Sequence, residues 1–290
     1  MPTPPPGPRH PPSSRYSTMP HHEMEPPEAL RNLVHCFWYH CLDFGEQPVV
    51  FEVPPDGYAE IIFYFGSACH LATPSGWQLL PSPFLMPLLQ QPARLTTINR
   101  LEIIGIRCFP WTVFELLGLS PGDAPLNLAA HALAQLHGPL SQYLQAGQLT
   151  EALAQVAQYG VQAQAQMPKP GWLVQAGRAM RAVTGTLPVR QVAAAAHVTV
   201  RTLERHFKHA AGYTVKDVSS LMRFEQVRNC LLLQPTTNIA ALAYTLGYTD
   251  QSHLSREFKR YSGVTPAVFA RKSLAKGPTI GPEVSAFPEP

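Results

Sequence analysis

A segment of 13 residues occurs twice in the last third of the chain, and this repeat limits the possible folds more than any other feature. Residues 202–214 read TLERHFKHAAGYT and residues 253–265 read HLSREFKRYSGVT, so Leu, Arg, Phe, Lys, Gly and Thr keep their places. Each copy is long enough for a helix and follows an Ala-rich amphipathic stretch and a short polar turn. This order is typical of a helix-turn-helix unit that binds DNA.

The charge of the chain is divided unevenly along its length. Residues 171–276 hold 15 Lys and Arg against 5 Asp and Glu, whereas residues 1–170 hold 7 against 12. The formal net charge of +3 therefore hides a strongly basic part and an acidic part. A basic part supplies the attraction to phosphates on which DNA-binding proteins depend. We predict that the basic part binds double-stranded DNA and that the acidic part does not.

The length and composition predict two folded domains in a cytoplasmic protein. A chain of 290 residues that is 45% hydrophobic can bury two ordinary cores. Residues 1–27 are rich in Pro, Ser and His, which predicts a disordered leader rather than a signal peptide. No apolar run approaches the roughly 20 residues that span a bilayer. Five cysteines, an odd number without framework spacing, fit a reducing compartment.

Short apolar segments rich in aromatic and β-branched residues predict an antiparallel β domain, either a small barrel or a sandwich. Turn signals such as Pro54-Pro55-Asp56-Gly57 and Pro81-Ser82-Pro83 separate them. The expected strands cover residues 34–39, 49–53, 60–65, 95–98 and 102–108. After Pro110 the apolar period becomes helical, and helices are expected around residues 113–117, 126–136, 140–144 and 149–159.

Residues 162–170 lose the helical period and end in Pro-Lys-Pro, so they are the expected linker. The predicted fold class is α+β: a β-rich N-terminal domain with trailing helices, then an all-α domain of two helix-turn-helix subdomains joined by a long helix. The expected boundaries are residues 1–27 for the leader, 28–161 for the β-rich domain, 162–170 for the linker, 171–276 for the DNA-binding domain and 277–290 for a flexible tail.

Each repeat divides into a first helix, a turn and a recognition helix. Thr199 is placed as the N-cap of the first recognition helix, and Gly212 ends that helix. Its expected apolar face is Val200, Leu203 and Phe207, and Leu254 and Phe258 anchor the second copy. The expected apolar stripes of the two first helices are Val189, Val192, Ala193 and Ala196, and Ile239, Leu242, Ala243 and Leu246.

The segment between the two copies is expected to be one continuous helix. Residues 215–233 contain no Gly or Pro and keep an apolar stripe. At 1.5 Å per residue this helix is about 28 Å long, close to the ~34 Å between successive major grooves on one face of B-DNA. One chain is therefore expected to bind two half-sites without a partner.

Residues 171–272 resemble the bipartite DNA-binding domain of AraC/XylS-type transcriptional regulators. The second copy carries the motif in Ile239-Ala-x-x-Ala243, Gly247-Tyr248-x-Asp250, Ser252-His253-Leu254-x-Arg256-x-Phe258-Lys259 and Gly263-x-Thr265-Pro266. The first copy departs from the family at two positions, with Val215 in place of the usual Pro and His197 in place of the usual turn Gly. Histidine adopts the left-handed backbone region more readily than most residues, so we expect the turn to be kept.

The N-terminal part resembles the β-rich, sensor-type domain that precedes this DNA-binding domain in one branch of the family. The similarity lies in Leu33-Val-x-x-Phe-Trp38, Val53-Pro-Pro-Asp-Gly57-x-x-Glu60-Ile-Ile62 and Ile104-Gly-Ile-Arg-x-Phe-Pro110. It implies a cupin-like fold that binds a ligand or forms a dimer, and it names no ligand.

Arg205 and Arg256 are the strongest candidates for contact with bases or phosphates. Both lie on the face opposite the Leu and Phe anchors, and Arg to guanine is the commonest specific contact; the alternative is an ordinary solvated charge. The resemblance implies that further residues face the groove or the DNA backbone. These are Arg201, Thr202 and Glu204 in the first copy and Gln251, Ser252 and His253 in the second.

Other patterns favour structural roles. His35-Cys36 and His40-Cys41 supply too few ligands for a zinc site, so buried cysteines and half-exposed histidines are the preferred interpretation. The aromatic residues between positions 37 and 65 fit both a core and an effector pocket. No phosphate loop, nucleophile elbow or carboxylate pair is present. We therefore predict no catalytic residue, no metal site and no cofactor.

These observations predict a sequence-specific transcription factor that is regulated by a signal at its N-terminal domain, and not an enzyme. Two alternatives stay open: a constitutive DNA binder whose N-terminal domain is an interaction platform, and an enzyme fused to a DNA-targeting module. Double-stranded DNA is the expected partner, and RNA polymerase and a small-molecule effector are further candidates. A monomer and a homodimer both fit the sequence.

Overall fold

The computed structural model describes residues 21–166 and 171–276, so the predicted tail and most of the predicted leader lie outside the described residues. The end of the leader is folded, contrary to expectation. His22–Met24 form strand β1, which pairs antiparallel with residues 37–39 of β2 (Val34–Asp43). This short segment contains no proline, so its N–H groups are available to a β ladder.

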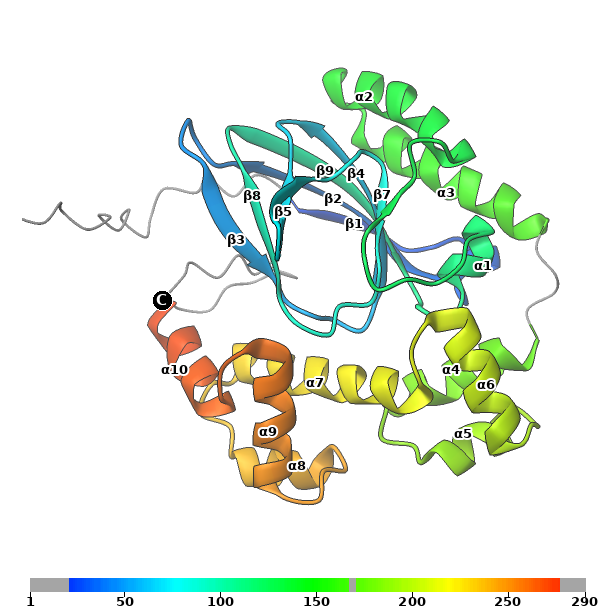
Figure 1. Ribbon diagram of the computed structural model, residues 1–290, viewed down its shortest axis with the longest axis vertical. Helices are drawn as coiled ribbons and strands as arrows, with labels where there is room; N and C mark the ends of the chain where they lie inside the picture. The colour runs from blue at the N-terminus through cyan, green and yellow to red at the C-terminus, as the bar shows by residue number, and fades with distance from the viewer. Residues whose placement is uncertain (1–20, 167–170, 277–290) are drawn as a thin grey trace, which may run out of the picture.

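The N-terminal part contains two antiparallel sheets (Figure 1). The first has the strand order β1-β2-β9-β4-β7-β10, and the second has the order β3-β8-β5-β6. The remaining strands of the first sheet are β9 (Arg100–Cys108), β4 (Ala59–Gly66), β7 (Phe84–Met86) and β10 (Leu126–Asn127). Those of the second are β3 (Val49–Val53), β8 (Ala93–Thr97), β5 (His70–Thr73) and β6 (Gly76–Leu79).

The five strands predicted from the sequence correspond to β2, β3, β4, β8 and β9. The sequence pattern missed β5, β6 and β7, which are short and lie next to Gly and Pro. The helix predicted over residues 126–136 is wrong. Residues 126 and 127 instead pair with β7, and only residues 132–136 form a 3-10 helix, for which the His131 imidazole accepts a bond from the Leu133 N–H.

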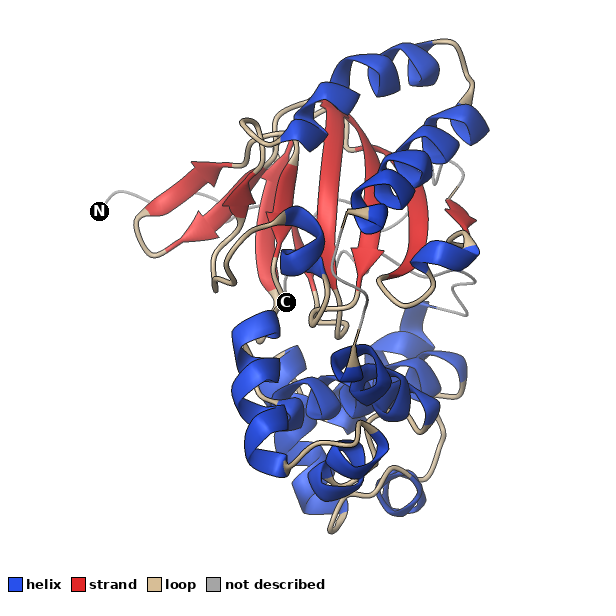
Figure 2. Cartoon of the chain, turned by 90° about the vertical axis from the view of Figure 1, so that its right-hand side faces the viewer, coloured by secondary structure: helices blue, strands red, loops and turns tan. Residues whose placement is uncertain are grey.

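Among residues 21–166, α1 (Val113–Leu117) lies between β9 and β10, and α2 (His137–Gln145) and α3 (Leu149–Ala165) follow the last strand. Figure 2 shows helices lying across one face of the larger sheet. Their apolar residues share a core with that face of the sheet, including Phe37, Ile61 and Leu153. Residues 162–165 of the predicted linker belong to α3, because Val161 and Ala163 still contact this core. Residues 167–170 lie outside the described part of the chain.

The other face of the larger sheet forms a separate core with the smaller sheet. This core includes Trp38, Phe51, Ile62 and Leu95. The indole of Trp38 lies directly over Gly105 of the neighbouring strand, where an added Cβ would be 2.1 Å from Trp38 Cε2. Glycine is therefore required at this position for the indole to pack against the strand.

The C-terminal part is entirely helical. Its helices are α4 (Trp172–Ala182), α5 (Val189–Ala195), α6 (Val200–Ala211), α7 (Val215–Leu233), α8 (Ile239–Thr245), α9 (Gln251–Ser262) and α10 (Pro266–Lys276). We call α5 with α6 the first unit and α8 with α9 the second unit. The long helix α7 joins them, and α6 and α9 lie towards its opposite ends (Figure 1). The predicted α+β fold class is therefore confirmed.

The two parts share a continuous apolar core. Phe109 and Trp111, which follow strand β9, stack with ring centroids 5.2 Å apart, and Trp111 continues to Phe207 of α6 at 5.8 Å. The guanidinium of Arg181 on α4 lies 3.9 Å from the centre of the Phe109 ring. Gly177 of α4 leaves room for the Trp111 indole. The β-rich part therefore packs directly against α4 and α6.

Candidate DNA-binding site

The two recognition helices, α6 and α9, begin and end in the same way. The Thr199 hydroxyl accepts a hydrogen bond from the Thr202 N–H at 3.2 Å, and the Asp250 carboxylate accepts one from the His253 N–H at 2.7 Å. Gly212 and Gly263 end the helices in the left-handed conformation, with φ of 78° and 75°. The predicted N-cap Thr199 and the predicted C-terminal Gly212 are confirmed.

The predicted anchors hold both recognition helices to the core. Leu203, Phe207, Leu254 and Phe258 are buried. Val200 was expected on the apolar face, but its side chain is 39% exposed because it lies in the first turn, before the helix reaches the core. The apolar stripes of α5 and α8 are buried or half-buried, as predicted.

The turn of each unit contains a residue in the left-handed conformation. His197 has φ of 54° in the first unit, and Gly247 has φ of 69° in the second. The expectation that the first turn tolerates histidine is thereby confirmed. Both turns bring the recognition helix back across the preceding helix, which is the arrangement of a helix-turn-helix unit.

The side chains predicted to contact DNA are accessible. Among the eight candidates, five are exposed: Arg201, Arg205, Gln251, Ser252 and Arg256. The other three, Thr202, Glu204 and His253, are half-buried. Contact with bases or phosphates stays a prediction for all eight.

Some candidate side chains already have partners within the protein. The Thr202 hydroxyl accepts a hydrogen bond from Thr199 at 2.9 Å. In the first unit the Arg205 guanidinium lies 3.0 Å from Nε2 of His206. These contacts orient the side chains before any ligand binds.

The sequence pattern missed Glu257 on the second recognition helix. Its carboxylate is 9% exposed and lies between Arg223 of α7, at 3.6 Å, and His253, at 3.5 Å. An acidic residue among basic ones on an amphipathic helix normally indicates a solvated position. A comparison of the two copies could have singled out Glu257, because the first copy has His206 at the equivalent position.

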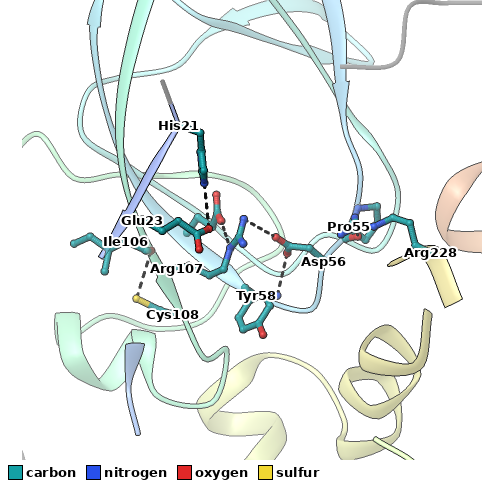
Figure 3. A network of polar contacts seen from close by, with 10 residues as sticks. His21, Glu23, Pro55, Asp56, Tyr58, Ile106, Arg107, Cys108 and Arg228 are labelled. Carbon is teal, nitrogen blue, oxygen red and sulfur yellow. Dashed lines mark hydrogen bonds and ion pairs between the residues drawn. The ribbon is translucent and has the colours of Figure 1, made fainter. Parts of the chain in front are cut away.

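A polar network connects the β-rich part to α7 (Figure 3). Arg107 on β9 lies 2.7 Å from the Glu60 carboxylate and 3.3 Å from that of Asp56. Beside Asp56, the carbonyl of Pro55 accepts a hydrogen bond from Arg228 of α7 at 3.1 Å. Burial, reinforced by the nearby Asp56, raises the pKa of Glu225 on α7 to about 7. The acidic part thus contacts the helix that joins the two units.

The cysteine and histidine pairs on β2 are placed as structural residues. Cys36 and Cys41 are buried, and burial raises the pKa of Cys36 to about 12, which keeps its thiol protonated. The His35 ring stacks on Tyr58 at 4.8 Å, and burial lowers the pKa of His40 to about 4. In residues 21–166 and 171–276 no three or more His, Cys, Asp or Glu side chains come together to hold a metal ion.

Most of the aromatic residues considered for an effector pocket are part of the cores. Phe37 and Phe63 pack under the helices, and Trp38 and Phe51 pack between the sheets. One apolar cavity, between the larger sheet and α3, has a volume of ≈ 10 Å³, which is at the limit for a single water molecule. None of the helices in the described ranges is long and apolar enough to cross a membrane.

Comparison with known proteins identifies the helical part. Residues 192–272 match a family described as a helix-turn-helix domain, and residues 22–124 match a domain of unknown function. The HTH-type transcriptional regulator RipA of Corynebacterium glutamicum is 30% identical over 80 residues, which are 28% of this chain. These residues cover 24% of RipA, so the similarity is limited to about a quarter of that protein.

Similar solved structures include ToxT from Vibrio cholerae, with 10% identity and a TM-score of 0.43 over 81% of this chain and 98% of that one. The C-terminal domain of AraT from Geobacillus stearothermophilus is 24% identical, with a TM-score of 0.33 over 36% of this chain and 86% of that one. Together with the repeated caps, anchors and turns, the family match shows that residues 192–272 form a helix-turn-helix domain.

Proposed function

We propose that this protein is a sequence-specific transcription regulator that inserts α6 and α9 into successive major grooves of DNA. The observation that carries the proposal is the equivalent placement of Arg205 and Arg256. Each is exposed on a recognition helix whose opposite face is anchored by a buried Leu and Phe. The continuous helix α7 supports the spacing of the two units, since its 19 residues extend about 28 Å.

Selection of genomic fragments by the purified full-length protein tests this proposal. We expect enrichment of a motif with two half-sites about one helical turn apart, at a fixed and stated salt concentration. The Arg205→Ala/Arg256→Ala double variant is expected to lose this motif while keeping its fold. Identical motifs from the double variant would remove both arginines from the base-reading residues, and no motif from either protein would contradict sequence-specific binding.

Base contact and phosphate contact are separated by two single variants of α9. Arg256→Ala is expected to cost about 1–3 kcal/mol at the selected site and to relax specificity at one base pair. Lys259, also exposed, lies one turn closer to the C-terminus, and Lys259→Ala is expected to weaken binding to all sequences alike. The check is a set of dissociation constants on selected and random duplexes. Equal losses on both duplexes for Arg256→Ala would make it a phosphate contact.

The N-terminal part is proposed to regulate this binding, because it packs on α6 through Trp111 and on α7 through Pro55. A sensor must bind its effector with different affinity in the DNA-bound and free states. Titration calorimetry of candidate small molecules in both states checks this expectation. A second candidate is a constitutive DNA binder whose β-rich part is an interaction platform; it is favoured by the packing of Phe37, Trp38, Phe51 and Phe63 in the cores.

We propose binding rather than catalysis as the activity of the whole chain, and the cytoplasm as its location. RNA polymerase is a further proposed partner. Sedimentation of the free protein and of its complex with the selected duplex distinguishes a monomer, which the two units in one chain favour, from a homodimer.

A further inference from the structure

We propose that Glu257 is a positioning residue of the second recognition helix. It fixes the His253 imidazole and thereby sets the base preference at the half-site bound by α9. This inference rests on the proposed function, because it concerns how α9 meets DNA. It differs from the predicted set of contact residues, since Glu257 itself is buried and acts through its neighbour.

The Glu257 carboxylate contacts a different basic side chain with each of its oxygens. One oxygen, Oε1, lies 3.6 Å from the Arg223 guanidinium, and the other, Oε2, lies 3.5 Å from Nε2 of His253 one turn earlier. Removing one partner of a buried charge leaves the other uncompensated. The carboxylate therefore has one neighbour at each oxygen and links α9 to α7.

Arg223 provides a fixed support for this carboxylate. Its Nη1 donates to the Gly185 carbonyl at 3.0 Å, and its Nη2 donates to the Ser220 hydroxyl at 3.1 Å. The guanidinium also lies 5.2 Å from the centre of the Tyr248 ring. Contacts with the α4–α5 connection, with α7 and with the turn before α9 leave it little freedom.

The His253 ring is held from both nitrogen atoms. Its Nδ1 accepts a hydrogen bond from the Thr249 N–H at 3.4 Å, so the proton of the neutral ring is on Nε2, which faces Glu257. The ring also meets Tyr248 edge to face, with centroids 5.4 Å apart. With both nitrogens directed at protein groups, His253 offers DNA its carbon edge, which suits apolar contact such as that with a thymine methyl.

In the first unit, a different contact joins the two positions that correspond to Arg223 and Glu257. A spacing of 51 residues aligns the buried Ala176 and Met180 of α4 with Val227 and Leu231 of α7. The same spacing relates Trp172 to Arg223 and His206 to Glu257.

The rings of Trp172 and His206 meet at 5.5 Å with an interplanar angle of 88°. The middle of each recognition helix therefore contacts the helix that precedes its unit: α6 contacts α4, and α9 contacts α7. The first contact leads to Arg205, 3.0 Å from Nε2 of His206, and only the second includes a carboxylate, which lies against His253.

The test uses the full-length protein and a randomised duplex library, followed by dissociation constants on the selected site and its single-base variants. Glu257→Gln is expected to lose about tenfold in discrimination at the half-site bound by α9, the low end of what one base contact contributes. It is expected to lose none at the other half-site. In a His253→Ala background, Glu257→Gln is expected to add no further loss.

His206→Gln is the matched control, because it changes the equivalent position of α6 and is expected to affect only the half-site bound by α6. Glu257→Asp, which keeps the charge, is expected to recover part of the discrimination and covers the case in which Glu257→Gln does not fold. Unchanged base preferences in a folded Glu257→Gln protein, with altered ones in His253→Ala, would overturn the inference.

A measurement on the free protein separates this inference from the proposed function. The ¹⁵N shifts of the His253 ring are expected to report the Nε2–H tautomer in the wild-type protein and a tautomer mixture in Glu257→Gln. If the wild-type protein selects no DNA motif, the proposed function fails, while the tautomer still reports whether Glu257 positions His253. The same tautomer ratio in both proteins would contradict the positioning role.

Discussion

At the scale of single residues, one close approach decides how the two sheets pack. The indole of Trp38 occupies the space in which any side chain at position 105 would begin. Gly105 lies in the middle of β9, where glycine normally weakens a strand. Its presence there is explained by the aromatic ring that crosses it.

We predict that Gly105→Ala lowers the free energy of unfolding by about 1–3 kcal/mol, the usual cost of overpacking a filled core. Gly138→Ala is the matched control, since an added Cβ at Gly138 meets nothing within 4 Å and alanine favours the helix α2. Urea unfolding of the three proteins is the measurement. Equal stability of Gly105→Ala and the wild-type protein would mean that the indole can move aside at little cost.

Residues on regular helix faces could be predicted from the sequence, whereas Glu257 could not. Leu203, Phe207, Leu254 and Phe258 follow helical spacing, which places them on the core side without knowledge of their partners. The burial of Glu257 depends on Arg223, which is 34 positions away and belongs to another helix. No local pattern contains that contact.

At the level of elements, the helix that follows the first unit and the helix that follows the second are capped differently at their N-termini. The first copy lacks the family's proline, and α7 begins instead with a capping box, in which Thr214 bonds the Asp217 N–H and the Asp217 carboxylate bonds the Thr214 N–H. The equivalent helix α10 begins at Pro266, and Val268 stands where the box would need an acidic residue. Proline at the first position and a capping box are alternative ways to begin a helix.

We predict that Thr214→Ala costs about 0.5–2 kcal/mol of stability, because the box loses its hydroxyl. Val215→Pro is expected to cost less, since the first N–H of a helix has no partner within the helix and Thr214 already has the extended backbone that precedes proline. Urea unfolding of both variants tests the order. A larger loss for Val215→Pro would show that the packing of the buried Val215 side chain outweighs the cap.

The type of an element could be predicted where a periodic segment was long. The prediction failed where strands were short. The 19-residue helix α7 followed from its apolar stripe and its lack of Gly and Pro, and the paired units followed from the repeated segment. The apolar residues at 126–136 also fit a helical period, but pairing with β7 holds the first two of them in a strand. The predicted end of the β-rich part at residue 161 was too early because α3 continues to residue 165 and still contacts the core at Ala163.

At the scale of the whole molecule, the sequence predicted an acidic part and a basic part but not their contact. An apolar stack through Phe109 and Trp111 and a polar contact through Arg228 join them. Because α7 carries both units, any change in this contact reaches the helix that sets their spacing. The contact is therefore the route by which the β-rich part is expected to influence DNA binding.

Glu225 makes this contact sensitive to pH. Burial and the nearby Asp56 raise its pKa from 4.5 to about 7 in the folded protein. Between these two values the folded chain keeps a proton that the unfolded chain has lost. The contribution of Glu225 to stability therefore falls as the pH rises from about 4.5 to 7 and is constant above that.

We predict that Glu225→Gln removes this slope and is more stable than the wild-type protein above pH 7, by about 1–3 kcal/mol, because one pKa unit corresponds to about 1.4 kcal/mol. The measurement is the free energy of unfolding of both proteins at intervals from pH 5 to 8. Glu151→Gln, at an exposed position of α3, is the matched control and is expected to follow the wild-type curve. A stability difference between Glu225→Gln and the wild-type protein that does not change with pH would show that Glu225 is ionised throughout this range, with Arg228 and Arg107 compensating its charge.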